Sequence, residues 1–225
     1  MPGQLVDVAQ QELVLAETSE AVSTQPPYSF SLPMDPSRID HTRVYVVNVS
    51  LIDGEHRAEG YLERNPQGFV PMLSIDGHDL TQSLAIIDYL DAKFREPRMV
   101  SSNPAERAKT LAQSLIIAAD IHPINNLRVL KYLQGNMGQE QAAVDDWYRH
   151  WIIEGFTALE AMADRSAPYL GGEEPNIADI CLVPQMANAI RFNTPLDAFP
   201  NLVRIDARCN GLDPFRAARP DAVKP

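Results

Sequence analysis

Few of the residues that could carry chemistry fall into a spacing that defines a reaction. His150 and Glu154 stand one helical turn apart, a separation that metal sites use, but two ligands alone make a weak case and a surface pair is the better interpretation. No metal site is predicted. The chain also lacks H-E-x-x-H, G-x-S-x-G, G-x-G-x-x-G and Walker A patterns, which argues against zinc proteases, α/β-hydrolases and nucleotide enzymes.

The cysteines do not indicate a redox or disulfide function. Cys181 and Cys209 form no disulfide framework and no C-x-x-C motif. Cys181 falls within an apolar helical pattern and is expected to be an inert buried thiol, whereas Cys209 is too isolated to assign. Because this cysteine usage favours a reducing, intracellular setting, we predict a cytoplasmic protein.

The composition fits a folded protein that binds a small molecule or another protein. The 225 residues are 45% hydrophobic and 22% charged, which allows one large or two small domains. The formal net charge of −11 argues against nucleic acid or an anionic membrane as a partner, because both select a basic surface. No apolar run approaches the roughly 20 residues of a membrane helix, and the acidic N-terminal segment does not resemble a signal peptide.

The first half of the chain has a sequence pattern typical of a small α/β domain. Residues 1–26 are predicted to be an extension, either disordered or with a short acidic amphipathic helix over residues 5–16. Strands are expected at Tyr28–Leu32 and Arg43–Leu51, because short runs rich in β-branched and aromatic residues favour strands. The two prolines between these strands leave room for one helical turn at most.

A hairpin is expected over residues 69–80, because Asp76-Gly77 is a strong turn signal, and Ser83 is a good cap for the helix that follows. Residues 91–103 resemble a linker, and everything beyond them has helical periodicity. A capping box is expected at Asn176 and Asp179. Helices are predicted near residues 104–133, 138–164, 176–192 and 200–210.

Two stretches in the first half resemble the glutathione-binding core of the glutathione transferases: NPQGFVPML at residues 65–73 and LTQSLAIIDYL at residues 80–90. Three further stretches resemble the zeta class of that family: DGEHR at 53–57, DIHPINNLRVL at 120–130 and ADICLVPQ at 178–185. The likeness extends from about Asp53 to the C-terminus and weakens before Asp53.

The resemblance implies an α/β plus all-α fold: a thioredoxin-like N-terminal domain with a shortened first helix at residues 27–95, then a helical domain at 104–225. It also implies a homodimer, with glutathione as cofactor. Val70 would pair with the glutathione backbone like an added strand, next to a cis Val70–Pro71 bond. By resemblance, the residues that hold glutathione are His56, Val70, Pro71, Gln82, Ser83, His122, Asn126 and Leu127.

The same resemblance assigns Arg128 and Arg191 to the carboxylates of a dicarboxylate substrate, which suits arginine because its planar fork grips a carboxylate with two bonds. The implied activity is glutathione-dependent cis-trans isomerisation of a maleylacetoacetate-like or maleylpyruvate-like compound, or of a natural-product intermediate. In this route the thiolate adds to the double bond, the resulting single bond rotates and the thiolate leaves.

One departure from the family concerns activation of that thiol. The family carries a Ser-Ser-Cys type motif after its first strand, but here Pro33, Met34 and Asp35 stand near those positions. An aspartate there would repel a thiolate, and Ser31 and Ser37 are the candidate hydroxyl substitutes. Three explanations stay open: a divergent isomerase with a rebuilt site, a protein that binds glutathione or an adduct without activating it, and a chain that has lost a segment. The rival functions are a conjugating transferase and a binding or scaffold protein without activity.

Simpler structural roles compete with several of these assignments. Taken alone, His122 before Pro123 would pack or cap a helix, and Arg128 and Arg191 would lie along apolar surface with their charges in water. A periodic row on the helix expected at 138–164 is interpreted as core rather than as a ligand platform: Trp147, Trp151, Phe156 and Leu159.

Overall fold

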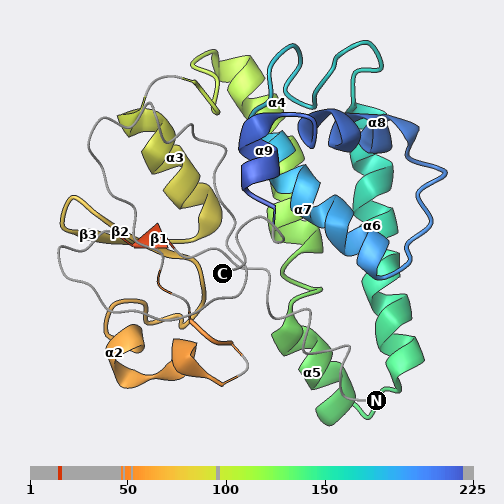
Figure 1. Ribbon diagram of the computed structural model, residues 1–225. Coiled ribbons are helices and arrows are strands. Elements are labelled where there is room, and N and C mark those ends of the chain that lie inside the picture. Colours follow the sequence, from red (N-terminus) through yellow and green to blue (C-terminus); the bar gives the residue numbers. More distant parts are fainter. Residues whose placement is uncertain (1–14, 17–46, 48, 52, 95–96, 220–225) are drawn as a thin grey trace. The chain divides into compact units, whose positions relative to one another are not determined.

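The computed structural model describes residues 15–16, 47, 49–51, 53–94 and 97–219 (Figure 1). The chain divides into two compact units. The first comprises Met1–Lys93 together with Asp213–Pro225, and the second comprises Phe94–Leu212. Helix α9 (Asp213–Ala217) lies in the C-terminal part of the first unit.

The first unit is organised around the expected hairpin. Strand β2 (Met72–Ile75) pairs antiparallel with β3 (His78–Thr81), with Leu73 opposite Leu80. Asp76 and Gly77 at the turn have φ angles of 53° and 77°, the left-handed conformation of a tight hairpin turn. Every residue of β2 is buried, so this strand forms the centre of the sheet. The hairpin prediction is confirmed.

A third strand, β1 (Leu15–Ala16), pairs parallel with β2, with Leu15 opposite Leu73. The expectation of a helix or disorder over residues 5–16 is wrong at these two residues. The physical reason is non-local: the outer edge of buried β2 carries backbone groups that require hydrogen-bond partners, and local periodicity does not record which distant segment supplies them. The strand expected at Tyr28–Leu32 lies outside the described residues.

The strand expected at Arg43–Leu51 is not seen in its described part, residues 47 and 49–51. Instead, the chain turns at Ser50, and hydrogen bonds to side chains stabilise the turn. The Ser50 hydroxyl donates to Asp53 Oδ2 (2.6 Å), and the Ser50 backbone N–H donates to Glu55 Oε2 (2.7 Å). Local bonds of this kind compete with strand pairing. The turn leads into the 3-10 helix η2 (Glu55–Arg57) and the short helix α2 (Glu59–Leu62).

Helix α3 (Ser83–Lys93) follows the hairpin, and in Figure 1 it lies on one side of the hairpin while α2 lies on the other. It begins at Ser83 itself, one residue earlier than a Ser83 cap would give. Its buried face includes Ile86, Ile87 and Leu90. At its far end, Tyr89 donates to Asp76 Oδ2 (2.6 Å), which fixes the helix to the hairpin turn.

The second unit is built of helices in its described part, with one isolated β-bridge between Tyr169 and Gly172. Helix α7 packs against α4 and α8, and α6 packs against α8 and the π-helix η3. No helix among the described residues has the length and apolar character needed to cross a membrane. The elements are α4 (Pro104–Leu115), η3 (Ile116–Ile121), α5 (Leu127–Gly135), α6 (Gln141–Met162), α7 (Ile177–Arg191) and α8 (Pro200–Cys209).

The helix predicted over residues 104–133 is divided into three pieces, which corrects that prediction. After α4 the chain widens into the π-helix η3, where His122 N–H donates to Ile117 O (2.8 Å). Pro123 then ends the helix because it has no N–H and restricts the residue before it. Asn126 starts α5 by accepting from Arg128 N–H (3.2 Å).

The other helix predictions agree with the structure to within a few residues. The capping box at Asn176 and Asp179 is present and begins α7. Of the row predicted as core on α6, Phe156 and Leu159 are fully buried, whereas Trp147 and Trp151 are partly exposed. Cys181 is also partly exposed, but burial of its thiol raises the pKa of Cys181 to about 12, which agrees with the inert role expected for it.

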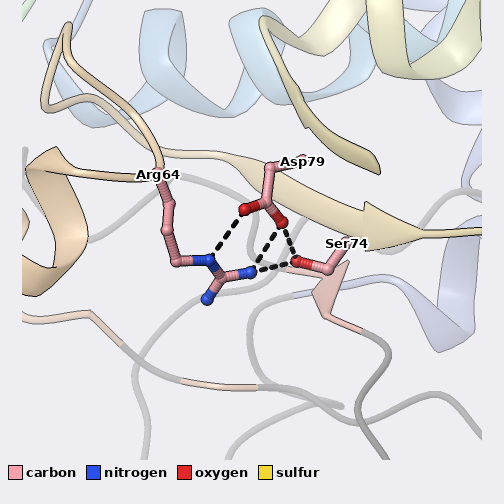
Figure 2. Close-up of polar contacts among 3 residues, drawn as sticks. All are labelled: Arg64, Ser74 and Asp79. Carbon is pink, nitrogen blue, oxygen red and sulfur yellow. Dashed lines mark hydrogen bonds and ion pairs between the residues drawn. The ribbon is translucent and has the colours of Figure 1, made fainter. Parts of the chain in front are cut away.

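An ion-paired cluster joins α2 to the hairpin (Figure 2). Arg64 follows α2 and donates through Nε and Nη2 to the two oxygens of Asp79 on β3, at 2.8 and 2.7 Å. The hydroxyl of Ser74 on β2 also contacts Arg64 and donates to Asp79 Oδ1 (2.5 Å). The Arg64 guanidinium holds the pKa of the Asp79 carboxyl below its usual range.

We predict that Asp79→Asn destabilises the protein at pH 7 by about 0.5–1 kcal/mol, because a bidentate but partly exposed ion pair is lost. A lowered folded-state pKa contributes stability above the unfolded-state pKa of about 3.9, and this contribution disappears as pH falls through the folded-state value. The difference in urea midpoint between the two proteins, measured by circular dichroism, should therefore shrink from pH 7 to pH 3. Glu63→Gln, next to Arg64 and exposed, is the control.

Candidate functional site

His56 lies in η2 and is half-buried. The next residue, Arg57, attaches η2 to the loop before β2: Nη1 donates to Gln67 O (3.2 Å), and the guanidinium lies 5.7 Å from the centre of the Phe69 ring. Gly68 permits this close approach. A Cβ atom at Gly68 would lie 2.8 Å from Arg57 Nη1 and 3.0 Å from His56 O, and its φ of 61° is left-handed. His56 is therefore held close to the loop that leads to Val70.

Val70 and Pro71 are buried and joined by a cis peptide bond, as the resemblance implies. The loop before them is fixed at Phe69, whose carbonyl accepts from Tyr61 Oη and Asn65 Nδ2, both at 2.6 Å. Within the described residues, neither backbone group of Val70 has a hydrogen-bond partner. An extended peptide could therefore pair with Val70 as an added strand.

Gln82 and Ser83 are exposed at the start of α3. Gln82 has a φ of 71°, and its Nε2 donates to Gln67 Oε1 (2.6 Å). Backbone N–H groups at a helix start favour an anion, so this position suits a peptide carboxylate. The described residues of the first unit thus bring together four of the predicted glutathione positions on neighbouring segments: Val70, Pro71, Gln82 and Ser83.

In the second unit, His122 directly follows η3 and is exposed, as is Arg128 in the first turn of α5. Asn126 is the cap of α5, and Leu127 is its first residue. The loop that holds His122 and Asn126 is bound to α6: Trp147 Nε1 donates to Ile124 O (3.0 Å). These predicted residues therefore belong to one short, anchored segment.

Arg191 is the last residue of α7 and is half-buried. Phe192 follows it and stacks on the buried Tyr148 of α6, with ring centres 3.6 Å apart and planes at 11°. Burial raises the pKa of Tyr148, while the positive charge of Arg191 opposes that rise. Tyr148 therefore stays protonated at neutral pH, and Arg191 lies near enough for its charge to influence the Tyr148 hydroxyl.

The candidate hydroxyls Ser31 and Ser37 lie outside the described residues. Sequence reasoning missed several residues that support the site: Arg57, Gln67, Gly68, Tyr148 and Phe192. Only the glycine left a local signal, since Gly68 precedes a strand pattern where close backbone approach is common. The others act through contacts between segments that are distant in sequence.

The glutathione S-transferase N-terminal domain model matches residues 39–98. A second family model, for type III secretion system lipoprotein chaperones (YscW), matches residues 4–58. This second match falls mostly before Asp53 and overlaps the first over residues 39–58.

Known proteins match most of the chain. The maleylacetoacetate isomerase of Rhizobium meliloti is 45% identical over 181 residues, which span 80% of this chain and 85% of that protein. The holo structure of a bacterial zeta-class maleylpyruvate isomerase has a TM-score of 0.75 at 37% identity, covering 78% and 84% of the two chains. The maleylacetoacetate isomerase of Methylobacterium extorquens with bound malonate and glutathione has a TM-score of 0.71 at 31% identity, with the same coverage.

The hairpin with its cis Val70–Pro71 bond and the helical second unit are the parts of the glutathione transferase fold. Within that fold, the chain belongs to the zeta class, the family of the maleylacetoacetate and maleylpyruvate isomerases.

Gly68→Ala should weaken both stability and glutathione binding. Gly68 and Gly77 both have left-handed φ angles, but a Cβ at Gly77 would contact nothing within 4 Å. Gly77→Ala therefore costs backbone strain alone, about 1 kcal/mol, and Gly68→Ala should cost at least about 1 kcal/mol more. Urea unfolding measures the stability difference and calorimetric titration measures glutathione affinity. Equal effects of the two substitutions would show that the packing around Gly68 does not hold the loop.

Proposed function

We propose that this protein is a glutathione-dependent cis-trans isomerase of an unsaturated dicarboxylic compound of the maleylacetoacetate or maleylpyruvate kind. The observation that carries the proposal is the open backbone of Val70 beside the exposed start of α3. This is the arrangement that a peptide cofactor with a free carboxylate requires. Relatives named as isomerases of these two compounds support the choice of reaction.

The residues of the first unit fit glutathione. Val70 offers one N–H and one C=O to an extended peptide, Gln82 and Ser83 offer donors to a carboxylate, and half-buried His56 is held against the same loop. When bound, glutathione supplies a thiolate nucleophile that adds reversibly to a double bond. The role of this chain is to hold and orient the peptide so that its thiol is presented to the substrate.

In the second unit, His122, Asn126 and Leu127 are proposed to contact glutathione, and Arg128 and Arg191 to hold the substrate carboxylates. Both arginines are accessible to solvent, and each stands at a helix end that is fixed by neighbouring contacts. Malonate bound with glutathione in a relative supports a dicarboxylate as ligand. The guanidinium fork would orient such a substrate and balance its charge throughout the reaction.

Ser31 and Ser37 are proposed as the groups that stabilise the thiolate in place of the missing Ser-Ser-Cys motif. Because this loop differs from the family motif, two rival functions also have to be tested. A conjugating transferase would consume glutathione with an electrophile. A binding or scaffold protein would turn over nothing.

We further propose domain boundaries at residues 27–95 and 104–225, with residues 1–26 as an extension. A homodimer is proposed by analogy with the family, and a cytoplasmic location because the compartment must supply glutathione and keep its thiol reduced.

Calorimetric titration with glutathione, paired with an absorbance assay for maleylpyruvate isomerisation, tests the proposed function directly. We expect binding, turnover that depends on glutathione, and full recovery of glutathione at the end. Consumption of glutathione would instead support the conjugating transferase. Failure to bind and to turn over would support the scaffold protein.

Arg191→Ala should lower kcat/KM for a dicarboxylate substrate by about 10- to 100-fold, because a charge-assisted pair of hydrogen bonds is lost. The Kd of glutathione should stay within about twofold of the parent value, because Arg191 is assigned to the substrate. Arg165→Ala, an exposed arginine of the same unit, serves as the control. Unchanged kinetics for Arg191→Ala would remove the substrate role.

A further inference from the structure

Three consecutive residues of α6, Trp147, Tyr148 and Arg149, contact both segments that carry the proposed substrate arginines. Toward α5, Trp147 Nε1 donates to Ile124 O (3.0 Å). The buried side chain of Asn125 donates through Nδ2 to Tyr148 O (3.1 Å). These two bonds fix the loop immediately before Asn126, whose side chain accepts the backbone N–H of Arg128.

Toward α7, the same turn of α6 fixes the residue that follows Arg191. The Tyr148 ring stacks on Phe192, and Arg149 Nη1 donates to Phe192 O (3.3 Å). Because a carbonyl at a helix end has no partner within its own helix, this bond also completes the end of α7. Both arginines therefore stand within a few residues of contacts to one turn of one helix.

Helix α6 is suited to act as a rigid reference for the two segments. It is 22 residues long, and Ile152, Phe156 and Leu159 along it are fully buried. Gly155 lets it approach η3 closely, since a Cβ there would lie 2.3 Å from Ile121 Cδ1. A packed helix of this kind moves little, so its contacts can fix the loop before α5 and the end of α7, where the two arginines stand.

We propose that Trp147, Tyr148 and Arg149 are positioning residues that set the separation of Arg128 and Arg191, and that they thereby select substrates by the distance between their carboxylates. This inference rests on the proposed function, since it assumes that both arginines bind substrate. Bidentate arginine contacts tolerate little displacement. If the contacts from α6 are loosened, the protein should therefore bind its substrate more weakly and distinguish less well between substrates of different length, even when both arginines remain.

A pair of tryptophan substitutions tests the contacts between α6 and the loop that precedes Arg128. Trp147→Phe and Trp151→Phe each remove an indole N–H from α6, but the buried Nε1 of Trp151 has no hydrogen-bond partner among the described residues. The two rings pack edge to face, 5.5 Å apart, so their surroundings are closely matched. Only Trp147→Phe should raise the KM of maleylpyruvate, by about three- to tenfold, the size expected for one hydrogen bond.

The contacts between α6 and the end of α7 are tested by a second matched pair of substitutions, at Asp146 and Arg149. Arg149 also forms an ion pair with Asp146 on the surface of α6 at 2.5 Å. Asp146→Asn removes that ion pair and leaves the bond to Phe192 O, so the KM should not change. Arg149→Met removes both and should raise the KM to a similar extent as Trp147→Phe, while Arg149→Lys, which keeps a donor, should restore part of it.

Substrate preference separates positioning from general destabilisation. Maleylpyruvate and maleylacetoacetate differ by one methylene between their terminal carboxyl groups. Loosening the contacts from α6 should reduce the preference between the two, with kcat within about twofold of the parent. For Arg149→Met the KM of glutathione should also stay within about twofold, because the end of α7 carries no residue assigned to glutathione. An equal loss on both substrates, equal effects of the two tryptophan substitutions, or no change in KM would each overturn the proposal.

Thermal denaturation of each variant checks that it folds. Should Trp147→Phe unfold, Asn125→Leu replaces it, since this substitution removes the bond to Tyr148 O while keeping the side-chain shape. Arg128→Ala and Arg191→Ala are assayed in parallel. If these two have no effect, the substrate role in the proposed function fails; if they reduce activity while the α6 variants do not, only the positioning role fails.

Discussion

The second unit depends on one buried carboxylate at the start of α7. Asp179 is fully buried, and its two oxygens accept the backbone N–H groups of Leu170, Gly171 and Asn176 at 2.8–3.0 Å. A buried charge is tolerated only when its hydrogen bonds are complete, so this network fixes the preceding loop and the first turn of α7 together. Asn176 extends the constraint to α4 by donating to Thr110 Oγ1 (3.2 Å).

From this anchor, the positions of the candidate substrate residues follow through packing. Helix α7 holds Asp179 in its first turn and Arg191 at its end, and α4 packs on α7 and continues into η3 and His122. Helix α6 then binds both ends, through Trp147 on one side and Tyr148 on the other. The regular helices supply most of the buried packing. The polar side chains lie at the irregular helix ends, which are formed by the π-helix η3, by Pro123 and by the loop capped by Asn126.

The first unit follows a similar logic with a different centre. Strand β2 is buried along its length, and the segments around it are fixed by side chains rather than by regular pairing: Arg57 holds η2 to the Gln67 loop, and Arg64 holds the end of α2 to Asp79. These contacts leave the backbone of Val70 open. The ion pairs Arg64–Asp79 and Lys93–Asp76 of this unit are partly exposed, so water and salt weaken them.

The sequence by itself determined the hairpin at Asp76-Gly77 and the capping box of α7, because each is written in adjacent residues whose local chemistry leaves few alternatives. The family and the cis Val70–Pro71 bond followed from the resemblance of whole stretches of sequence. The sequence did not determine the pairing of Leu15–Ala16 with β2, the division of residues 104–133, or the residues that support the site. Tertiary structure decided those features, since an open strand edge, a π-turn packed on Gly155 and the Tyr148–Phe192 stack exist only when distant segments meet.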